Sequence, residues 1–112
     1  MLRQPINEFR QSNGRPGLPI DNIQENEYCL WHCKYMASVC CCHTPAEMLY
    51  GKAEAVGYRG FFRDYREALR AIIFEDFATS NQGHRELILF SHNLAAAFHE
   101  ERNCVFVTIR GW

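Results

Sequence analysis

Cysteine is the residue type in this sequence that most clearly points to chemistry. Five of the six cysteines fall within fourteen consecutive positions, namely Cys29, Cys33, Cys40, Cys41 and Cys42. A thiolate is both a nucleophile and a ligand for soft metal ions, so the cluster points either to cysteine catalysis or to metal binding. We expect reduced thiols, because two cysteines on one helix seldom meet disulfide geometry. Reduced thiols favour a cytoplasmic location.

The stretch around Cys29 favours one particular form of catalysis. Its sequence, Gln-Glu-Asn-Glu-Tyr-Cys-Leu-Trp at residues 24–31, resembles the start of papain-like cysteine peptidases, including their bacteriocin-leader peptidase branch. The resemblance implies that Cys29 is a nucleophile at the start of a helix, where unpaired N–H groups lower the pKa of a thiol. It also implies that Gln24 contributes to an oxyanion hole. Residues 103–105, where the family would place its base, contain no histidine.

Metal binding is a second interpretation of the same segment. Cys29 and Cys33 lie one helical turn apart, so together they can offer two thiolates to Zn²⁺ or Cu⁺. Tetrahedral sites normally take four ligands, and the sequence shows no second pair at a suitable spacing. We therefore assign no metal ligand and no cofactor, and expect these cysteines to pack as small apolar side chains.

Histidines, arginines and aromatic residues provide further candidates for ligand binding. His92 and His99 stand seven residues apart on a predicted helix, about 10 Å along its axis, which is too far for one metal ion. Four arginines from Arg59 to Arg70 form a basic ridge, for which a solvated helix face is the simpler interpretation. Eight Phe, five Tyr and two Trp exceed the needs of a small core, so we expect some to line a pocket or an interface. The candidate ligand-binding residues are Trp31, His92, His99, Arg63, Arg66 and Arg70.

The composition limits the classes of function. The chain has 112 residues, of which 47% are apolar and 22% charged, and this balance predicts one small soluble domain. A formal net charge of −1 supplies no field for nucleic acid or anionic lipid, so we expect neither as a partner. No apolar run approaches the roughly 20 residues that span a bilayer, and the first residues lack the apolar core of an export signal.

Hydrophobic periodicity predicts the elements that must position these side chains. A capping box with proline in the first turn marks the start of the second predicted helix. A β-branched apolar run at residues 104–109 predicts one strand. A lone strand leaves its backbone groups unpaired, so it must pair with an unrecognised short strand, with the N-terminal arm or with a partner chain. The predicted helices cover about residues 28–42, 44–56, 61–74 and 84–102.

These elements predict a mainly α fold of the α+β class, with about four helices in one layer or bundle and a C-terminal strand. Residues 1–27 form a loop-rich N-terminal arm, and residues 28–112 form a single helical domain. Because no complete catalytic set is present, the leading hypothesis is a small cytoplasmic, non-catalytic binding module. We expect it to associate with itself, as a homodimer, through an aromatic-lined pocket or interface. A cysteine hydrolase or transferase using Cys29 is the first alternative, and a protein that binds zinc or copper is the second.

Overall fold

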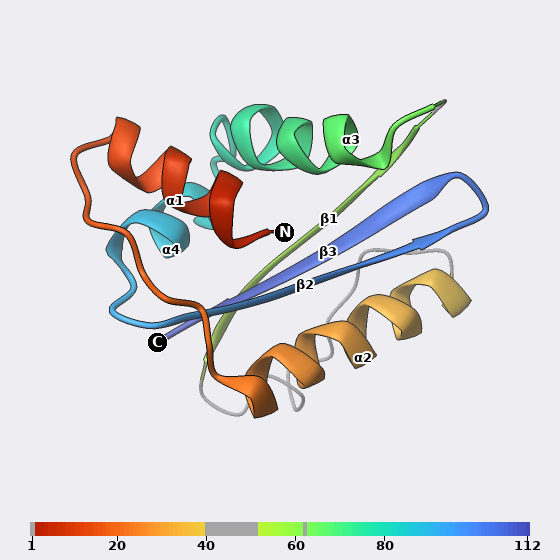
Figure 1. Ribbon diagram of the computed structural model, residues 1–112, viewed down its shortest axis with the longest axis horizontal. Coiled ribbons are helices and arrows are strands. Elements are labelled where there is room, and N and C mark those ends of the chain that lie inside the picture. The colour runs from red at the N-terminus through yellow and green to blue at the C-terminus, as the bar shows by residue number, and fades with distance from the viewer. Residues whose placement is uncertain (1, 40–51, 62) are drawn as a thin grey trace.

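The computed structural model describes residues 2–39, 52–61 and 63–112, which form a three-stranded antiparallel sheet with helices on both faces (Figure 1). In Figure 1, α2 lies along one face of the sheet, and α1, α3 and α4 lie on the other. Within the described residues, no helix combines the length and the apolar character needed to cross a membrane. The elements are α1 (Arg3–Ser12), α2 (Ile23–Val39), β1 (Ala53–Gly60), α3 (Tyr65–Ala71), the π-helix η2 (Ile72–Phe77), α4 (His84–Phe90), β2 (Leu94–Glu101) and β3 (Cys104–Gly111).

The last strand of the chain lies at the centre of the sheet. β3 pairs antiparallel with β1 on one side and with β2 on the other, so that Gly111 stands opposite both Ala53 and Leu94. All residues of β3 except the first are buried. Its β-branched and apolar side chains suit a strand that is covered on both faces. The strand predicted from the sequence thus finds its hydrogen-bonding partners in two further strands of the same chain.

The predicted fold class is wrong in its β content. We expected four helices and a single C-terminal strand, but residues 53–60 and 94–101 form β1 and β2. Residues 53–56 and 94–101 belong to the second and fourth predicted helices, and residues 57–60 lie between the second and third predicted helices. The suggested pairing of the final strand with the N-terminal arm or with a partner chain is wrong for the same reason. Residues 44–51 of the second predicted helix lie outside the described residues.

A tight turn explains why an alanine-rich segment forms β2. Arg102 and Asn103 connect β2 to β3 with φ values of 53° and 59°, both in the left-handed region. Two left-handed residues in a row are the mark of a type I′ hairpin turn, whose twist matches that of the flanking strands. Pairing along the whole length of β3 then outweighs the helix preference of alanine, which amounts to less than about 1 kcal/mol per residue.

Two apolar clusters hold the layers of the fold together. The larger cluster fills the space between the sheet and the helices α1, α3, η2 and α4. The smaller cluster lies under α2, where Cys33 and Met36 pack near Phe106 of β3. Alternate residues of a strand face opposite sides of the sheet, so β3 contributes to both clusters. Along β3, Val105, Val107 and Ile109 face the larger cluster, while Phe106, Thr108 and Arg110 face α2.

Arg10 attaches the N-terminal segment to the body of the fold, and Asn7 ties the chain that follows α1 back to that helix. Arg10 is buried, and its Nη1 donates hydrogen bonds to the carbonyls of Ile88 and Leu89 near the end of α4. A helix leaves such carbonyls unpaired at its C-terminus. The side-chain amide of Asn7 exchanges two hydrogen bonds, of 2.7 and 2.8 Å, with the backbone of Leu18. The segment between α1 and α2 is thereby held in place beside the sheet. The first 27 residues thus include α1 and the start of α2, and the predicted division of the chain after residue 27 stays a prediction.

Candidate functional site

A groove follows the outer edge of β2. In the part of the chain that the structure describes, β2 has a neighbouring strand on one side only. One wall of the groove comes from α2, and the other from the start of α1 and the segment that leads into α2, enclosing about 400 Å³. We name it the β2 groove, and its lining residues are Leu2, Arg3, Ile20, Ile23, Asn26, Glu27, Leu30, Ala96, Ala97 and Phe98.

The walls of the β2 groove are mainly aliphatic. Ile23 and Leu30 are seven residues apart on α2, two turns along the same side of the helix. Ile20 lies just before α2 with φ at 50°, a left-handed conformation that a β-branched residue rarely adopts. The side chain of Ile23 is 71% exposed. Large apolar side chains gathered at an open groove are typical of interaction sites.

The floor of the β2 groove presents backbone hydrogen-bonding groups. The N–H of Ala96 points away from β3, because it donates to Asn26 Oδ1 at 3.0 Å. Since strand residues alternate in direction, the N–H and C=O groups of Phe98, and of Glu100 just beyond the lining of the groove, point the same way. No other described residue hydrogen-bonds the N–H of either residue. The Asn26 amide, which also donates from Nδ2 to the carbonyl of Ile20 at 3.1 Å, demonstrates that this edge accommodates an amide group.

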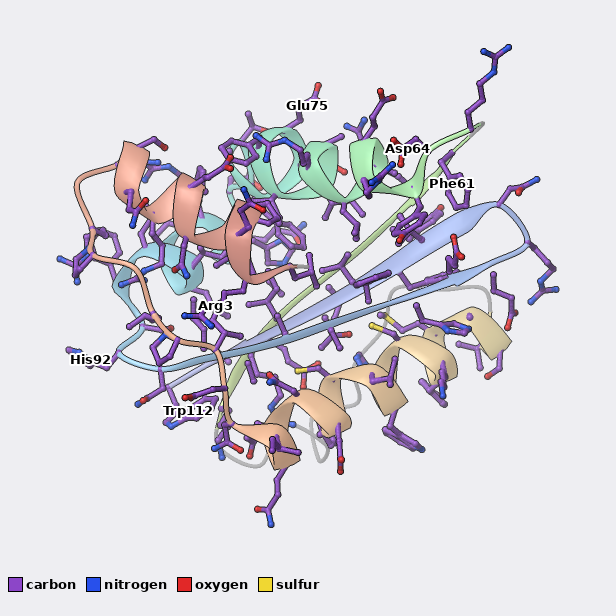
Figure 2. All side chains as sticks on the ribbon, viewed as in Figure 1. Arg3, Phe61, Asp64, Glu75, His92 and Trp112 are labelled. Atoms are coloured by element: carbon purple, nitrogen blue, oxygen red, sulfur yellow. The ribbon has the colours of Figure 1, made fainter. Side chains whose placement is uncertain are left out.

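The two walls of the β2 groove carry opposite charges. Arg3 lies at the start of α1, and Figure 2 shows it between α1 and the segment that leads into α2. Glu27 lies on α2, on the opposite wall. Both residues are exposed, and neither forms an ion pair or hydrogen bond with another described residue. Each is therefore available to a charged group of a ligand.

A second polar arrangement is buried beneath α2. Glu54 of β1 and Arg110 of β3 have side chains only 2% exposed, and Glu54 Oε2 lies 3.7 Å from Arg110 Nη1. The fully buried His32 of α2 places Nδ1 3.3 Å from Glu54 Oε1 and 3.1 Å from Thr108 Oγ1. Glu25 Oε2 lies 3.4 Å from Arg110 Nε. Buried charges are tolerated where they are paired, so this cluster ties α2 to both strands.

Cys29 borders the buried cluster rather than solvent. Because α2 begins at Ile23, Cys29 lies in the second turn of the helix, where the N-terminal N–H groups no longer act on it. Burial, reinforced by the neighbouring Cys33 and Glu54, raises the pKa of the Cys29 thiol far above its ordinary value. At neutral pH the thiol is protonated and is a weak nucleophile. Gln24 is exposed in the first turn of α2. The catalytic assignment of these two residues stays a prediction, which selective alkylation would test.

Two of the six predicted ligand-binding residues lie on α2 and β2 but outside the β2 groove. Trp31 is on the outer side of α2 and is 49% exposed. Its ring centroid lies 5.8 Å from that of Tyr28 and 6.0 Å from that of Tyr35. His99 belongs to β2, and its Nε2 lies 3.4 Å from Glu101 Oε1. The ring contacts form an aromatic ridge along the exposed side of α2.

The other four predicted ligand-binding residues are spread over the far end of the sheet and over α3. His92 borders a hollow of about 510 Å³ between α4 and β1, and Figure 2 shows it near Trp112. Arg63 borders a hollow of about 490 Å³ beside α3. The six residues are thus distributed over α2, the β2 strand, the segment before it and the region of α3, and their roles stay predictions. Arg66 pairs with Asp64 at 3.1 Å, and Arg70 pairs with Glu8 at 2.8 Å.

The sequence interpretation missed the buried ion pair and the β2 groove. The signal for Arg110 is present in β3, where polar Thr108 and Arg110 alternate with apolar neighbours and so mark one polar face. The β2 groove has no comparable signal. It exists because Ala96 to Phe98 form a strand, whereas an alanine-rich segment favours a helix.

Comparison with known proteins indicates no function for this chain, so its function is inferred from the geometry of the structure. Neither a protein-family model nor a curated protein matches the chain. Among the residues that the structure describes, no three or more His, Cys, Asp or Glu side chains are grouped to hold a metal ion. Cys40, Cys41 and Cys42 lie outside those residues.

Proposed function

We propose that this chain is a small, non-catalytic binding module that takes an extended segment of a partner protein into the β2 groove. The observation that carries the proposal is an open backbone edge lying between two apolar walls. A segment that pairs with β2 would satisfy the outward N–H and C=O groups of Phe98 and Glu100. In such complexes the main chain supplies affinity, and pockets for alternate side chains supply selectivity.

A free segment fits the β2 groove better than a second copy of this chain does. β2 forms the floor of the groove, and α1 and α2 flank it on either side. The β2 edge of a second copy has the same flanking helices, and we expect these helices to keep two such edges apart. The occupant is therefore a strand or tail without flanking helices. Self-association, which the sequence analysis predicts, would have to use another surface.

We also propose a cytoplasmic location for the module. Cys29, Cys33 and Cys104 support this location, because all three are free thiols. Small domains in oxidising compartments commonly join their cysteines in disulfides.

Selection from a library of random seven-residue peptides displayed on phage tests the proposed function. We expect enrichment of peptides with alternating apolar residues, and at least about a tenfold loss of their affinity for Leu30→Glu. The reason is that a carboxylate in the apolar wall would lose its hydration when the peptide binds. The free-energy cost of that desolvation exceeds about 1.4 kcal/mol, which corresponds to a tenfold loss of affinity. Val39→Glu is the matched control, because Val39 lies on the same helix, is 47% exposed and does not border the groove.

Three outcomes would contradict the proposal. One is the absence of any enriched peptide, and another is equal binding to Leu30→Glu and to the unaltered protein. Ile23→Glu repeats the measurement at a residue that is 71% exposed and therefore remote from the folding core. The third is a dimer in sedimentation that Ile23→Glu dissociates, because the occupant of the groove would then be a second copy.

A further inference from the structure

Arg3 and Glu27 lie on opposite faces of the sheet as well as on opposite walls of the β2 groove. Arg3 is the first residue of α1, which covers the face of the sheet that carries the larger apolar cluster. Phe98 of β2 points to the same face and packs against that cluster. Glu27 belongs to α2, which covers the other face through contacts such as that of Cys33 Sγ with Thr108 Oγ1 at 3.3 Å. A ligand strand lying in the plane of the sheet would therefore have Arg3 to one side and Glu27 to the other.

Successive side chains of any β-strand point to opposite faces of its sheet. In a segment added to β2, the residues that face α1 would meet Arg3, and the residues that face α2 would meet Glu27. We infer that the β2 groove selects segments in which an acidic and a basic residue stand an odd number of positions apart, with the acidic residue toward Arg3 and the basic residue toward Glu27. This inference rests on the proposed function.

The inferred spacing rule does not depend on the direction in which the segment binds. Alternation is a property of the added strand itself, so it holds for parallel and for antiparallel addition. An acidic and a basic residue two positions apart would face the same wall. One of them would then lie on the side of the like charge, and the other wall charge would stay unpaired. The arrangement of Arg3 and Glu27 thus distinguishes peptides of identical composition.

The expected size of this selectivity follows from the exposure of the two side chains. Ion pairs at exposed positions contribute roughly 0.2 to 1 kcal/mol each, which corresponds to about 1.5-fold to 5-fold in affinity. Changing the spacing from odd to even removes at least one such pair. We therefore expect an affinity ratio of about 1.5 to 5 at low ionic strength, and a ratio near one in concentrated salt, where exposed charges are screened.

Three synthetic seven-residue peptides, each with three valines and two threonines besides the two test residues, test the inference. The first carries Asp and Lys three positions apart, the second carries them two positions apart, and the third carries Asn and Gln instead. Calorimetry of each peptide with the unaltered protein should rank the first peptide above the second. The double variant Arg3→Gln with Glu27→Gln should bind all three peptides equally. Arg66→Gln, which removes a charge on α3 away from the groove, should keep the ranking of the unaltered protein.

The outcomes separate this inference from the proposed function. Binding of the uncharged peptide together with equal affinity for the two charged peptides would overturn the spacing rule and leave the proposed function standing. A preference for the two-position spacing would also overturn the rule. Failure of all three peptides to bind would overturn the proposed function and the spacing rule with it.

Discussion

Cys29 has the residue type and the sequence neighbours of a catalytic cysteine, yet its environment in the fold is that of a core residue. Its side chain is fully buried, and it lies next to the cluster formed by Glu54, Arg110 and His32. Low dielectric surroundings disfavour the thiolate, and the nearby carboxylate disfavours it further. The sequence shows the thiol but not its burial, because the burial depends on β1 and β3, which are distant from α2 along the chain.

Alkaline pH should weaken the unaltered fold more than it weakens Cys29→Ala. In the unfolded chain the thiol ionises at its ordinary pKa of 9.0, whereas the folded thiol, with its raised pKa, stays protonated. The unfolded state thus loses the proton first, so the stability that this thiol contributes is present below pH 9 and is lost as the pH rises above it. The difference in unfolding free energy between the two proteins should shift by about 1.4 kcal/mol between pH 8 and pH 10.

Urea titrations of both proteins at the two pH values measure that shift. The comparison with Cys29→Ala removes the contributions of the other groups that titrate in the same range. A difference that is the same at pH 8 and at pH 10 would contradict a buried, protonated thiol at this position.

At the scale of elements, the close approach of β1 to η2 explains the role of a glycine whose position in a strand the sequence did not reveal. Gly57 directly follows the second predicted helix, a position that suits a glycine cap, but it lies within β1, opposite Val107 of β3. A Cβ on Gly57 would lie 3.0 Å from Phe77 Cε1 and 3.3 Å from Ile72 Cγ2 of η2. The glycine therefore allows η2 to pack directly on the sheet. A helix cap and a close backbone approach both favour glycine, so the residue type alone could not distinguish them.

Gly57→Ala should destabilise the fold by about 1 to 3 kcal/mol, because the added methyl group overpacks the contact with η2. Gly60→Ala is the matched control within the same strand. Its Cβ would meet Asn103 O at 3.8 Å as its nearest neighbour, an ordinary contact distance. Thermal and urea denaturation of both variants measure the effect. Equal stabilities of Gly57→Ala and Gly60→Ala would show that η2 does not approach β1 this closely.

The elements that can be predicted from the sequence are those whose residues carry a local signal. The β-branched run at residues 104–109 correctly indicated β3, and the periodicity after residue 28 correctly indicated most of α2. The sequence predicts helix for residues 94–101 and 53–56 because alanine-rich and mixed segments carry no local strand signal. Their strand conformation comes from pairing with β3, which is a tertiary effect.

For the molecule as a whole, the proposed site arises where segments distant in the sequence meet. The β2 groove combines the start of α1, the segment before α2, one side of α2 and the edge of β2. No single stretch contains enough of it to form a motif. The site residues predicted from sequence lie elsewhere, because they were chosen by residue type along predicted helices. An open strand edge is recognisable only once the order of strands in the sheet is known.

Amide hydrogen exchange at the edge of β2 tests the central claim most directly. The measurement compares the free protein with the protein saturated by a peptide from the phage selection. We predict that the N–H groups of Phe98 and Glu100 exchange more slowly in the complex, because each gains a carbonyl partner from the bound segment. The N–H of His99, which points toward β3, should change little. Unchanged exchange at Phe98 and Glu100 in the saturated complex would contradict the claim that the segment binds as an added strand.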